Sequence, residues 1–565
     1  MQRQQFIQNI SDNPEVDVLI VGGGINGIGT FRDLALQGVR VLLVERSDFA
    51  SGASAASSHM VHGGIRYLEN GEFRLVREAV RERNLLLQNA PHLVRPLPTV
   101  IPIFKIISGI LNAPLKFLGW LTKPAERGAV VIKLGLMMYD AYTIGKNRTI
   151  PKHRFENRKK SLERYPKLNS KIKYTATYYD GSMISPERLA LEVLLDGLES
   201  SSDAMAINYM SLASGDPSAV EIKDEISGDV HSINPKVIVN AAGPWIDFAN
   251  QRIGKATKFM GGTKGSHLVL RHQELRDAIG ESELFFENID GRITLIFPLE
   301  DQVLIGTSDL PIDDPDKAVC TEEEVGYFLE MLNVVFPVIK VDPSHIVYRF
   351  SGVRPLPASD ATTTGQISRD HSIKMIDPEK DGEAPVLSLV GGKWTSFRAF
   401  SEQVTDKVLE HLKRSRKNST EQVAIGGGKN FPNSDQKQKY ISELSTKTGL
   451  AEDKVENLFQ RYGTRASEVA VFIAENGQGE PAALADTRYL KSEIEFLVRQ
   501  EHVQRLGDLV QRRTSLAMFG QLTQQSLNEI ADIMADALGW SDQRKASEVS
   551  DLREILEIKH GVAKL

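Results

Sequence analysis

The feature that most constrains this fold is a short hydrophobic strand that runs directly into a glycine-rich turn. Residues 17–21 (DVLIV) are rich in β-branched side chains, which is typical of a buried parallel strand. The turn at 22–27 (GGGING) matches G-x-G-x-x-G, and a helical pattern then runs from about Ile25 to Gln37, where Gly38 ends it. A second strand at 40–44 brings Glu45 to its carboxyl end. This order of elements predicts a Rossmann-like unit that binds a dinucleotide.

Each residue of this fingerprint has a predicted part in dinucleotide binding. Gly22 permits the tight turn, Gly24 lets the pyrophosphate approach the backbone, and Gly27 lets the helix pack against the strand. The phosphates are expected at the unsatisfied N–H groups of the helix N-terminus. Glu45 can accept hydrogen bonds from ribose hydroxyls, and its charge argues against a 2′-phosphate. The predicted contacts in this part of the chain are Gly22, Gly24, Ile25, Asn26, Gly27, Glu45 and Arg46. The fingerprint alone does not separate FAD from NAD.

Length and composition set further bounds on the fold and the class of function. The chain has 565 residues, whereas a single core stops growing at roughly 250–300 residues, so we expect about two to four domains. The formal net charge of -6 argues against a nucleic-acid binder. The single cysteine, Cys320, cannot build a cysteine-rich zinc site, and no H-E-x-x-H motif occurs, so we predict no metal site.

An unusual run after the second strand points to the class of ligand. Residues 51–58 (SGASAASS) are small or carry hydroxyls, so the backbone can approach a flat ligand and the hydroxyls can meet its phosphate or ring edge. The run continues as HMVHGGIRYLE at 59–69, which a flexible polar linker would not explain. Here the chain resembles the family of FAD-dependent glycerol-3-phosphate dehydrogenases and oxidases. In that family a Ser-Ser-x-x-x-His-Gly-Gly-x-Arg-Tyr-Leu-Glu run follows the same fingerprint.

The resemblance extends through most of the chain. Residues 237–245 (VIVNAAGPW) resemble the family's later flavin-domain strand and turn, and 391–398 (GGKWTSFR) resemble its closing loop under the flavin. KGSH at 264–267 and GTSD at 306–309 resemble two substrate-domain signatures, SGVRPL at 351–356 and ISRD at 367–370 follow, and RRT at 512–514 resembles a motif of the C-terminal helical cap. The resemblance implies FAD; we expect it to be bound noncovalently, and the sequence leaves a covalent flavin bond open. Its further predicted contacts are Ser57, Ser58, His62, Gly63, Gly64, Ala242, Gly243, Trp245, Gly391, Gly392, Lys393, Trp394 and Thr395.

The reaction that this resemblance implies is oxidation of sn-glycerol 3-phosphate to dihydroxyacetone phosphate. Hydride leaves C2 for N5 of the flavin, while the C2 hydroxyl loses its proton. The flavin supplies the redox chemistry, and the protein supplies binding, orientation and electrostatics. Such a site needs a cation for the phosphate, a base for the hydroxyl, and positive charge near the N1/O2 edge of the reduced flavin.

Residues within the family motifs are the candidates for these roles. Arg66 and Arg354 are the leading phosphate ligands, because a guanidinium can bind phosphate through two hydrogen bonds. His267 is the first choice for the base, and His62 competes with it. Lys393 is expected to stabilise the anionic reduced flavin or to polarise the substrate. The predicted catalytic residues are His267, His62, Arg66, Lys393 and Arg354, and the predicted substrate ligands are Arg66, Tyr67, His267, Thr307, Ser308, Arg354 and Arg369.

The order of the motifs predicts an α/β protein of three domains, two of them discontinuous. The Rossmann-like FAD-binding domain is expected over 1–84, 181–256 and 345–412. An α+β substrate domain with an antiparallel sheet is expected over 85–180 and 257–344, with strands at 292–298 and 302–305.

The remainder, 413–565, is predicted to be an all-helical cap domain that follows a polar linker at 413–433. Val455, Leu458, Phe459 and Tyr462 fall on one helix face, and the segments 526–538 and 547–558 look similar. A helical bundle that binds a partner would show the same pattern, and the RRT motif favours the cap.

Two neighbouring segments bear on attachment to a membrane. The segment 97–121 is long and apolar, but Pro102 and Pro114 interrupt it, and Lys105 and Lys116 also argue against a helix that spans a bilayer. Between Lys146 and Lys173 there are 11 Lys and Arg residues against two Glu. An apolar segment with a basic patch is typical of reversible attachment to anionic lipid, and the alternative is a core-packing insertion followed by a solvated basic face. With the resemblance to quinone-linked peripheral enzymes, the pattern favours a cytoplasmic protein peripherally associated with a membrane.

The leading functional prediction is an FAD-dependent glycerol-3-phosphate dehydrogenase that passes electrons to a membrane quinone. One alternative is a flavin oxidase of similar fold that uses oxygen and acts on glycerol 3-phosphate, an amine or an amino acid. Another is a flavin-binding tethering or regulatory protein without turnover. Arg66, Arg354 and the KGSH run favour the phosphorylated alcohol, and the intact GGK loop at 391–393 argues against a non-catalytic role. The sequence leaves the electron acceptor and the oligomeric state open, and a homodimer is one such state.

Overall fold

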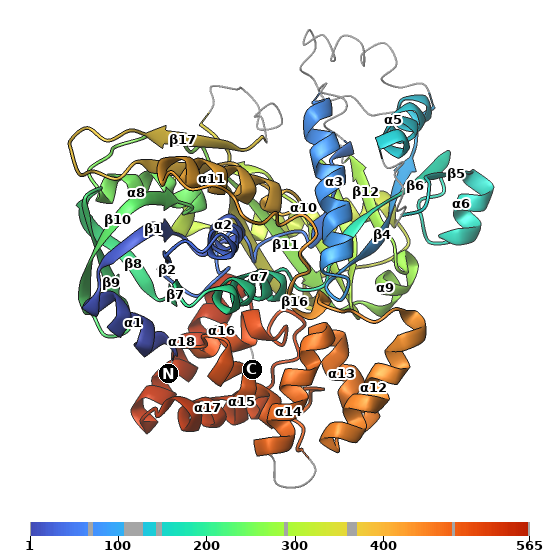
Figure 1. The fold of residues 1–565 in the computed structure, drawn as a ribbon. Helices are drawn as coiled ribbons and strands as arrows, with labels where there is room; N and C mark the ends of the chain where they lie inside the picture. The colour runs from blue at the N-terminus through green and yellow to red at the C-terminus, as the bar shows by residue number, and fades with distance from the viewer. Residues whose placement is uncertain are drawn as a thin grey trace.

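Two large β-sheets and a C-terminal group of helices make up the computed structural model of this chain (Figure 1). The structure describes residues 2–65, 72–106, 128–142, 150–287, 292–358, 370–476 and 481–562. The predicted fold class, a Rossmann-like unit with an α+β domain and a helical C-terminal domain, is confirmed.

The first sheet carries the glycine-rich fingerprint. Its strands lie in the order β17-β18-β10-β1-β2-β7, and all of them except β17 run parallel. Their bounds are β1 Glu15–Val21, β2 Val41–Glu45, β7 Ala204–Asn208, β10 Val230–Asn240, β17 Ser372–Ile376 and β18 Val386–Val390, with β8 Met210–Asp216 and β9 Ala219–Asp224 attached through β10. Nearly every residue of β1 and β2 is buried, because helices cover both faces of this sheet.

The helices that cover this sheet come from distant parts of the chain. On one face pack α2 (Ile25–Leu36), α7 (Pro186–Ser200) and α11 (Phe397–His411). On the other face pack α1 (Gln2–Asp12) and α8 (Ile246–Arg252). Helix α2 begins and ends close to its predicted bounds, and Gly38 follows it with φ +71°.

The second sheet is largely antiparallel, as predicted for the substrate domain. Its order is β15-β11-β14-β13-β12-β4-β6-β3, with β16 paired to β11 and β5 paired to β6. The bounds are β3 Met60–Val61, β4 Val94–Ile103, β5 Arg154–Asn157, β6 Tyr174–Met183, β11 Thr263–Leu270, β12 Glu283–Glu287, β13 Ile293–Leu299, β14 Gln302–Gly306, β15 Leu310–Pro311 and β16 Ile346–Arg354. The strands expected at 292–298 and 302–305 are therefore confirmed as β13 and β14.

Strand β16 bears on where one domain ends and the next begins. It falls inside the range 345–412 that was assigned to the FAD-binding domain, yet it pairs along its length with β11 of the second sheet. We propose that this boundary lies after Arg354 rather than at residue 345.

Several helices from the first 340 residues pack on the second sheet. Helices α9 (Gln273–Ile279) and α10 (Glu322–Val335) share one hydrophobic cluster with its central strands. Helices α3 (Phe73–Asn89) and α5 (Ala129–Tyr142) form another with β4 and β6, and the short α6 (Arg158–Arg164) follows β5 (Figure 1).

The C-terminal helices lie at the lower side of Figure 1 and share one hydrophobic cluster with residues of β11, β13, β14 and β16 of the second sheet. They are α12 Ser434–Thr448, α13 Glu452–Tyr462, α14 Ala466–Asn476, α15 Lys491–Gln500, α16 Leu506–Asp508, α17 Gln524–Leu538 and α18 Asp542–His560, with a π-helical turn at Leu509–Arg513. The predicted face of Val455, Leu458, Phe459 and Tyr462 is buried on α13, and Gly463 ends that helix. The prediction of a helical domain here is confirmed.

The predicted linker at 413–433 joins α11 to α12, but part of it is tightly packed. Its short 3-10 turn at Gly426–Gly428 is buried. A Cβ atom on Gly427 would lie 1.8 Å from the carbonyl oxygen of Tyr462, and one on Gly426 would lie 2.0 Å from Oε2 of Glu192. The three glycines thus let the chain pass closely between α7 and the C-terminal helices, which composition alone did not indicate.

The apolar segment at 97–121 begins as a strand. Residues 97–103 belong to β4 and pair with β6, and residues 107–121 lie outside the described residues. Within the ranges that the structure describes, no helix combines the length and apolar character needed to cross a membrane.

Candidate functional site

The glycine-rich turn has the geometry that a bound pyrophosphate requires. Gly22 has φ +110°, a conformation that favours glycine. Gly24 precedes the first residue of α2, and a Cβ atom on Gly27 would lie 2.0 Å from the carbonyl oxygen of Gly22. The helix can therefore approach β1 only because position 27 has no side chain.

Glu45 is fixed at the carboxyl end of β2 by two backbone groups. Its Oε2 accepts a hydrogen bond from the Gly23 N–H at 2.7 Å, and its Oε1 accepts one from the Ser47 N–H at 2.9 Å. Burial raises the pKa of Glu45, while these two N–H groups oppose that rise. The carboxylate is thus held where the fingerprint expects the ribose of the nucleotide.

Ser54 is a site residue that the sequence reasoning did not single out. Its Oγ accepts a hydrogen bond from the Ile25 N–H at 2.9 Å, at the first turn of α2. Its carbonyl oxygen accepts one from the Trp394 indole N–H at 2.9 Å. The hydroxyl-rich composition of 51–58 gave the signal, but Ser57 and Ser58 were chosen instead.

The loop after β18 joins three parts of the site. Gly392 has φ +101°, and a Cβ atom there would lie 2.5 Å from Nδ2 of Asn26 at the start of α2. The Asn26 side chain donates a hydrogen bond to the Gly391 carbonyl at 3.4 Å. Thr395 Oγ1 accepts one from the His62 N–H at 3.1 Å. The loop at 391–396 therefore contacts α2, Ser54 and the His62 turn at once, as a loop that closes over a flavin must.

Arg354 lies at the end of β16, with its guanidinium held by the loop after β14. Its Nη2 donates to Thr307 Oγ1 at 2.9 Å and to the Ser308 carbonyl at 3.0 Å, and its Nη1 donates to Asp309 Oδ1 at 3.0 Å. A Cβ atom on Gly265 of β11 would lie 2.3 Å from Nη2. The predicted ligands Arg354, Thr307 and Ser308 are thus brought together, and Asp309 is an additional partner.

His267 lies on β11 between Gly306 of β14 and Phe350 of β16. Its ring stacks on Phe350 with centroids 4.9 Å apart, and its Nε2 lies 2.8 Å from Ser58 Oγ. Burial lowers the pKa of His267 to about 3, with further contributions from the charges of Arg354 and His59. The imidazole is therefore neutral over the physiological range and can act as a hydrogen-bond acceptor.

The segment 51–58 connects the two sheets. Ser58 reaches His267, and a Cβ atom on Gly352 of β16 would lie 2.5 Å from Cβ of Ala56. The same segment reaches α2 through Ser54. This segment therefore contacts both the start of α2 beside the fingerprint and His267 of the second sheet.

Several motif residues are engaged in contacts of their own. Lys264 of the KGSH run is buried and pairs with Glu324 of α10 at 2.6 Å, so its charge stabilises the substrate sheet. Arg46 pairs with Asp316 and lies 4.6 Å from the ring centroid of Trp245, whose indole N–H also donates to Asp316.

The remaining predicted contacts fall in three places. Ser57 Oγ accepts a hydrogen bond from the His59 N–H at 3.3 Å, and Ala242 and Gly243 form the turn after β10. Gly63 and Gly64 follow His62 in the same turn, and Lys393 lies between Gly392 and Trp394 in the closing loop. Arg66, Tyr67 and Arg369 lie outside the described residues, so their predicted roles stay predictions.

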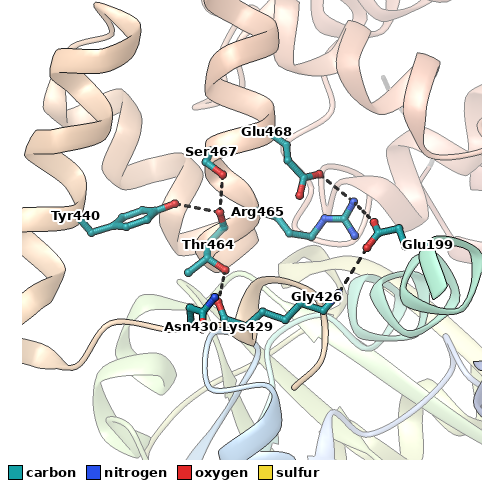
Figure 2. A pocket seen from close by; sticks show the side chains of 9 residues that line it. All are labelled: Glu199, Gly426, Lys429, Asn430, Tyr440, Thr464, Arg465, Ser467 and Glu468. Atoms are coloured by element: carbon teal, nitrogen blue, oxygen red, sulfur yellow. Dashed lines mark hydrogen bonds and ion pairs between the residues drawn. The ribbon is translucent and has the colours of Figure 1, made fainter. Parts of the chain in front are cut away.

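A hollow of about 450 Å³ lies where the C-terminal helices meet α7 and the glycine turn (Figure 2). Lys429 pairs with Asp196 at 2.6 Å, and Arg465 pairs with Glu199 at 3.3 Å and Glu468 at 3.0 Å. None of the predicted site residues lines this hollow. Its basic groups are engaged in ion pairs that join the cap to the rest of the protein.

Comparisons with known proteins agree with this geometry. A family model described as FAD dependent oxidoreductase matches residues 17–376, and one described as the C-terminal domain of alpha-glycerophosphate oxidase matches residues 418–545. The fold and the site thus define an FAD-dependent oxidoreductase. A glycerol-3-phosphate dehydrogenase of Synechocystis is 32% identical over 96% of this chain and 97% of the relative. The chain belongs to the glycerol-3-phosphate dehydrogenase family.

Two further similarities place the chain within this family. The mitochondrial glycerol-3-phosphate dehydrogenase of Homo sapiens is 27% identical over 99% of this chain and 75% of the relative. The structure of the glycerol-3-phosphate dehydrogenase from Bacillus halodurans complexed with FAD matches with a TM-score of 0.76 and 25% identity, covering 99% of this chain and 97% of that one. An L-alpha-glycerophosphate oxidase from Mycoplasma pneumoniae, at 17% identity and a TM-score of 0.52, shares the fold. The prediction of FAD as the cofactor is confirmed.

The residues present fit this cofactor. Gly27 packs closely on Gly22, as the fingerprint for a dinucleotide requires, and Glu45 is fixed at the carboxyl end of β2, where the fingerprint predicts a ribose ligand. The loop at 391–396 has two glycines where a planar ring system needs access to the backbone. When bound, FAD supplies the hydride-accepting chemistry.

Proposed function

We propose that this chain oxidises sn-glycerol 3-phosphate to dihydroxyacetone phosphate, with hydride transfer from C2 to N5 of FAD, and passes the electrons to a membrane quinone. The main support for this proposal is the position of the Arg354 guanidinium beside the His267 imidazole. Three acceptors hold the guanidinium beside the buried imidazole, while Ser58 links that imidazole to the fingerprint side. A cation and a proton acceptor so placed fit a phosphorylated alcohol.

Arg354 is proposed to bind the phosphate. Its guanidinium is oriented before any ligand arrives, so little of its side-chain freedom remains to be lost on binding. Arg66, Tyr67 and Arg369 are proposed to add contacts to the substrate, and Lys393 is proposed to stabilise negative charge on the reduced flavin.

The choice of base depends on how the substrate changes the charge around His267. The positive charge of Arg354 is one cause of the low pKa of His267. A phosphate dianion on Arg354 would offset that charge, so we propose that substrate binding raises the pKa of His267 and makes it a better proton acceptor. His62 is the alternative base. Its backbone N–H donates to Thr395, so this residue lies next to the closing loop.

Flavin reduction in the absence of oxygen tests the proposed reaction. sn-Glycerol 3-phosphate added to the FAD-bound protein is expected to bleach the flavin band near about 450 nm, whereas glycerol without phosphate is expected to react far more slowly. Unchanged colour with FAD retained would favour a binding protein without turnover. Comparison of His267→Gln with His62→Gln in the same assay assigns the base, because the variant that lacks it should lose rapid reduction.

The electron acceptor is tested on the reduced protein. Mixing it with a soluble quinone is expected to reoxidise the flavin much faster than mixing it with air-saturated buffer. Faster reoxidation by oxygen would support the oxidase alternative.

We also propose that the protein attaches peripherally to an anionic membrane surface. On α5, Val130, Leu134 and Met137 form an apolar stripe with exposed fractions of 51%, 60% and 54%. The exposed basic residues of the nearby segment are Lys152, Arg158, Lys159, Lys160, Arg164, Lys167, Lys171 and Lys173. Exposed apolar area beside clustered positive charge supports attachment through both signals.

Co-sedimentation with vesicles tests this attachment. Binding is expected to anionic vesicles, to weaken as salt is added, and to fall in Leu134→Asp. Equal recovery with neutral vesicles, or recovery that salt does not change, would contradict the electrostatic part.

A further inference from the structure

One buried carboxylate oxygen lies behind the His62 turn and accepts hydrogen bonds from three elements. Oδ1 of Asp180 on β6 accepts from the Gly63 N–H at 3.0 Å, from Arg83 Nη1 of α3 at 2.9 Å, and from the Tyr139 hydroxyl of α5 at 2.6 Å. Arg83, Asp180 and Tyr139 are each at most 2% exposed. The carboxylate therefore ties the backbone of the turn to two helices that are themselves packed on the second sheet.

The turn is held from its other side by the closing loop. The His62 N–H donates to Thr395 Oγ1 at 3.1 Å, and the next N–H along the chain, that of Gly63, donates to Asp180. A Cβ atom on Gly63 would lie 2.0 Å from the Tyr139 hydroxyl oxygen. Two successive peptide groups are thus fixed from opposite sides, and the Tyr139 hydroxyl packs directly against the backbone between them.

The protonation states of Arg83, Tyr139 and Asp180 determine the direction of each hydrogen bond among them. Arg83 Nη1 donates to the Tyr139 hydroxyl oxygen at 2.8 Å, so the phenol proton is directed toward Asp180. Burial raises the pKa of Tyr139 well above its usual range, and the phenol therefore stays a donor. The guanidinium balances the buried carboxylate, which would otherwise be costly to desolvate.

We propose that Arg83, Tyr139 and Asp180 are positioning residues for the reaction. They act through the Gly63 N–H to fix the His62–Gly64 turn against the closing loop, and thereby set the position of His62 relative to flavin and substrate. The effect of the triad on turnover rests on the proposed function, whereas its effect on the turn does not. None of the three lies in a motif that marks the site in the sequence.

The test compares two variants that each lose one buried phenol hydroxyl. Tyr139→Phe removes the donor to Asp180 and leaves the ring in place. Tyr165→Phe is the matched control, since its hydroxyl bonds Ser282 Oγ at 3.0 Å and its ring packs in a different hydrophobic cluster. Both are measured as FAD-bound protein by amide hydrogen exchange of the peptide that contains Gly63, and by anaerobic flavin reduction at saturating sn-glycerol 3-phosphate.

Tyr139→Phe is expected to exchange the Gly63 amide about tenfold faster than the parent and to reduce flavin about tenfold more slowly. The substrate concentration at half-maximal rate should change little, because the ligands of the phosphate are untouched. Tyr165→Phe should match the parent in both measurements. Asp180→Asn, which weakens all three hydrogen bonds by removing the charge of the acceptor, is expected to change both rates in the same direction and serves if Tyr139→Phe does not fold.

Equal exchange of the Gly63 amide in the parent and in Tyr139→Phe or Asp180→Asn would overturn the proposal. So would faster exchange with an unchanged rate of flavin reduction, because the turn would then be free to move without effect on the reaction. If the parent itself is not reduced by sn-glycerol 3-phosphate, the proposed function fails, and the exchange measurement alone decides whether the triad fixes the turn.

Discussion

Arg513 donates two parallel hydrogen bonds to the carboxylate of Asp48, from Nη1 to Oδ2 and from Nη2 to Oδ1, each at 2.8 Å. Asp48 follows β2 three residues after Glu45, and Arg513 belongs to the C-terminal helical domain. Arg512 Nε adds a third bond to Asp48 at 2.6 Å. The RRT motif thus joins the C-terminal helices to the loop that follows Glu45.

Removing this carboxylate should destabilise the protein strongly. Burial alone would raise the pKa of Asp48, but the charges of Arg513 and Arg512 hold it well below its usual value. Asp48→Ala leaves the buried Arg513 guanidinium without its anion, while Arg512 keeps its bond to Asp508. The loss is expected to cost about 3–5 kcal/mol in the free energy of unfolding. Glu322→Ala, which removes an exposed carboxylate paired with Arg349, should cost at most about 1 kcal/mol. Urea unfolding measures both, and similar losses would contradict the argument.

Stability should fall as the pH is lowered below about 6.5. Burial lowers the pKa of His267 to about 3 and the pKa values of His59, His502 and His560 to about 4. Since the unfolded histidines bind protons from the reference value of about 6.5 downward, the unfolded state gains protons first and stability is lost through that window. His502→Gln should flatten the dependence of unfolding free energy on pH between 6.5 and 4. A flat parent profile would refute the prediction.

Arg354→Lys should weaken binding of the phosphorylated substrate. A lysine cannot reproduce the three hydrogen bonds to Thr307, Ser308 and Asp309 that orient the guanidinium. KM for sn-glycerol 3-phosphate is expected to rise about tenfold or more. Arg349→Lys, five residues earlier on the same strand and paired with Glu322, is the matched control. Steady-state kinetics measure both, and an unchanged KM in Arg354→Lys would exclude this arginine as the main phosphate ligand.

Gly27→Ala should abolish stable FAD binding. The new Cβ atom would lie 2.0 Å from the carbonyl oxygen of Gly22, so either the helix or the pyrophosphate turn must move. Gly135→Ala places a methyl group on α5 where no atom lies within 4 Å, and it should be neutral or stabilise by up to about 1 kcal/mol. The FAD content of the purified proteins and their melting temperatures distinguish the two. Full FAD content in Gly27→Ala would contradict the geometry of the turn.

The parts of the site that could be predicted consist of residues that lie close together in the sequence. The strand, glycines, helix and acid at 17–45 follow one another directly, so spacing was enough to place them. The closing loop at 391–398 and the signatures around Arg354 were found by their resemblance to a family. Their roles depend on local geometry, which neighbouring residues determine.

The parts that could not be predicted join residues far apart in the chain. Asp48 and Arg513 are separated by 465 positions, Gly63 and Asp180 by 117, and Ser58 and His267 by 209. No periodicity or spacing indicates such partners, because they meet only when the two sheets and the cap pack together. Lys264 lies in a motif that resembles a substrate-domain signature, yet its ammonium group pairs with Glu324 of α10. Its motif did not indicate this partner.

The order of strands in the first sheet has a consequence for synthesis on the ribosome. Strand β1 lies between β2 and β10, and β10 in turn pairs with β18. After β2 has left the exit tunnel, about 190 further residues must be made before β10 can cover the free edge of β1. At about 5–20 residues per second this takes about 10–40 s. During that interval an apolar parallel strand presents open backbone groups. The nascent chain therefore passes through a long stage in which chaperones, rather than its own later strands, must keep this edge from pairing with other polypeptides.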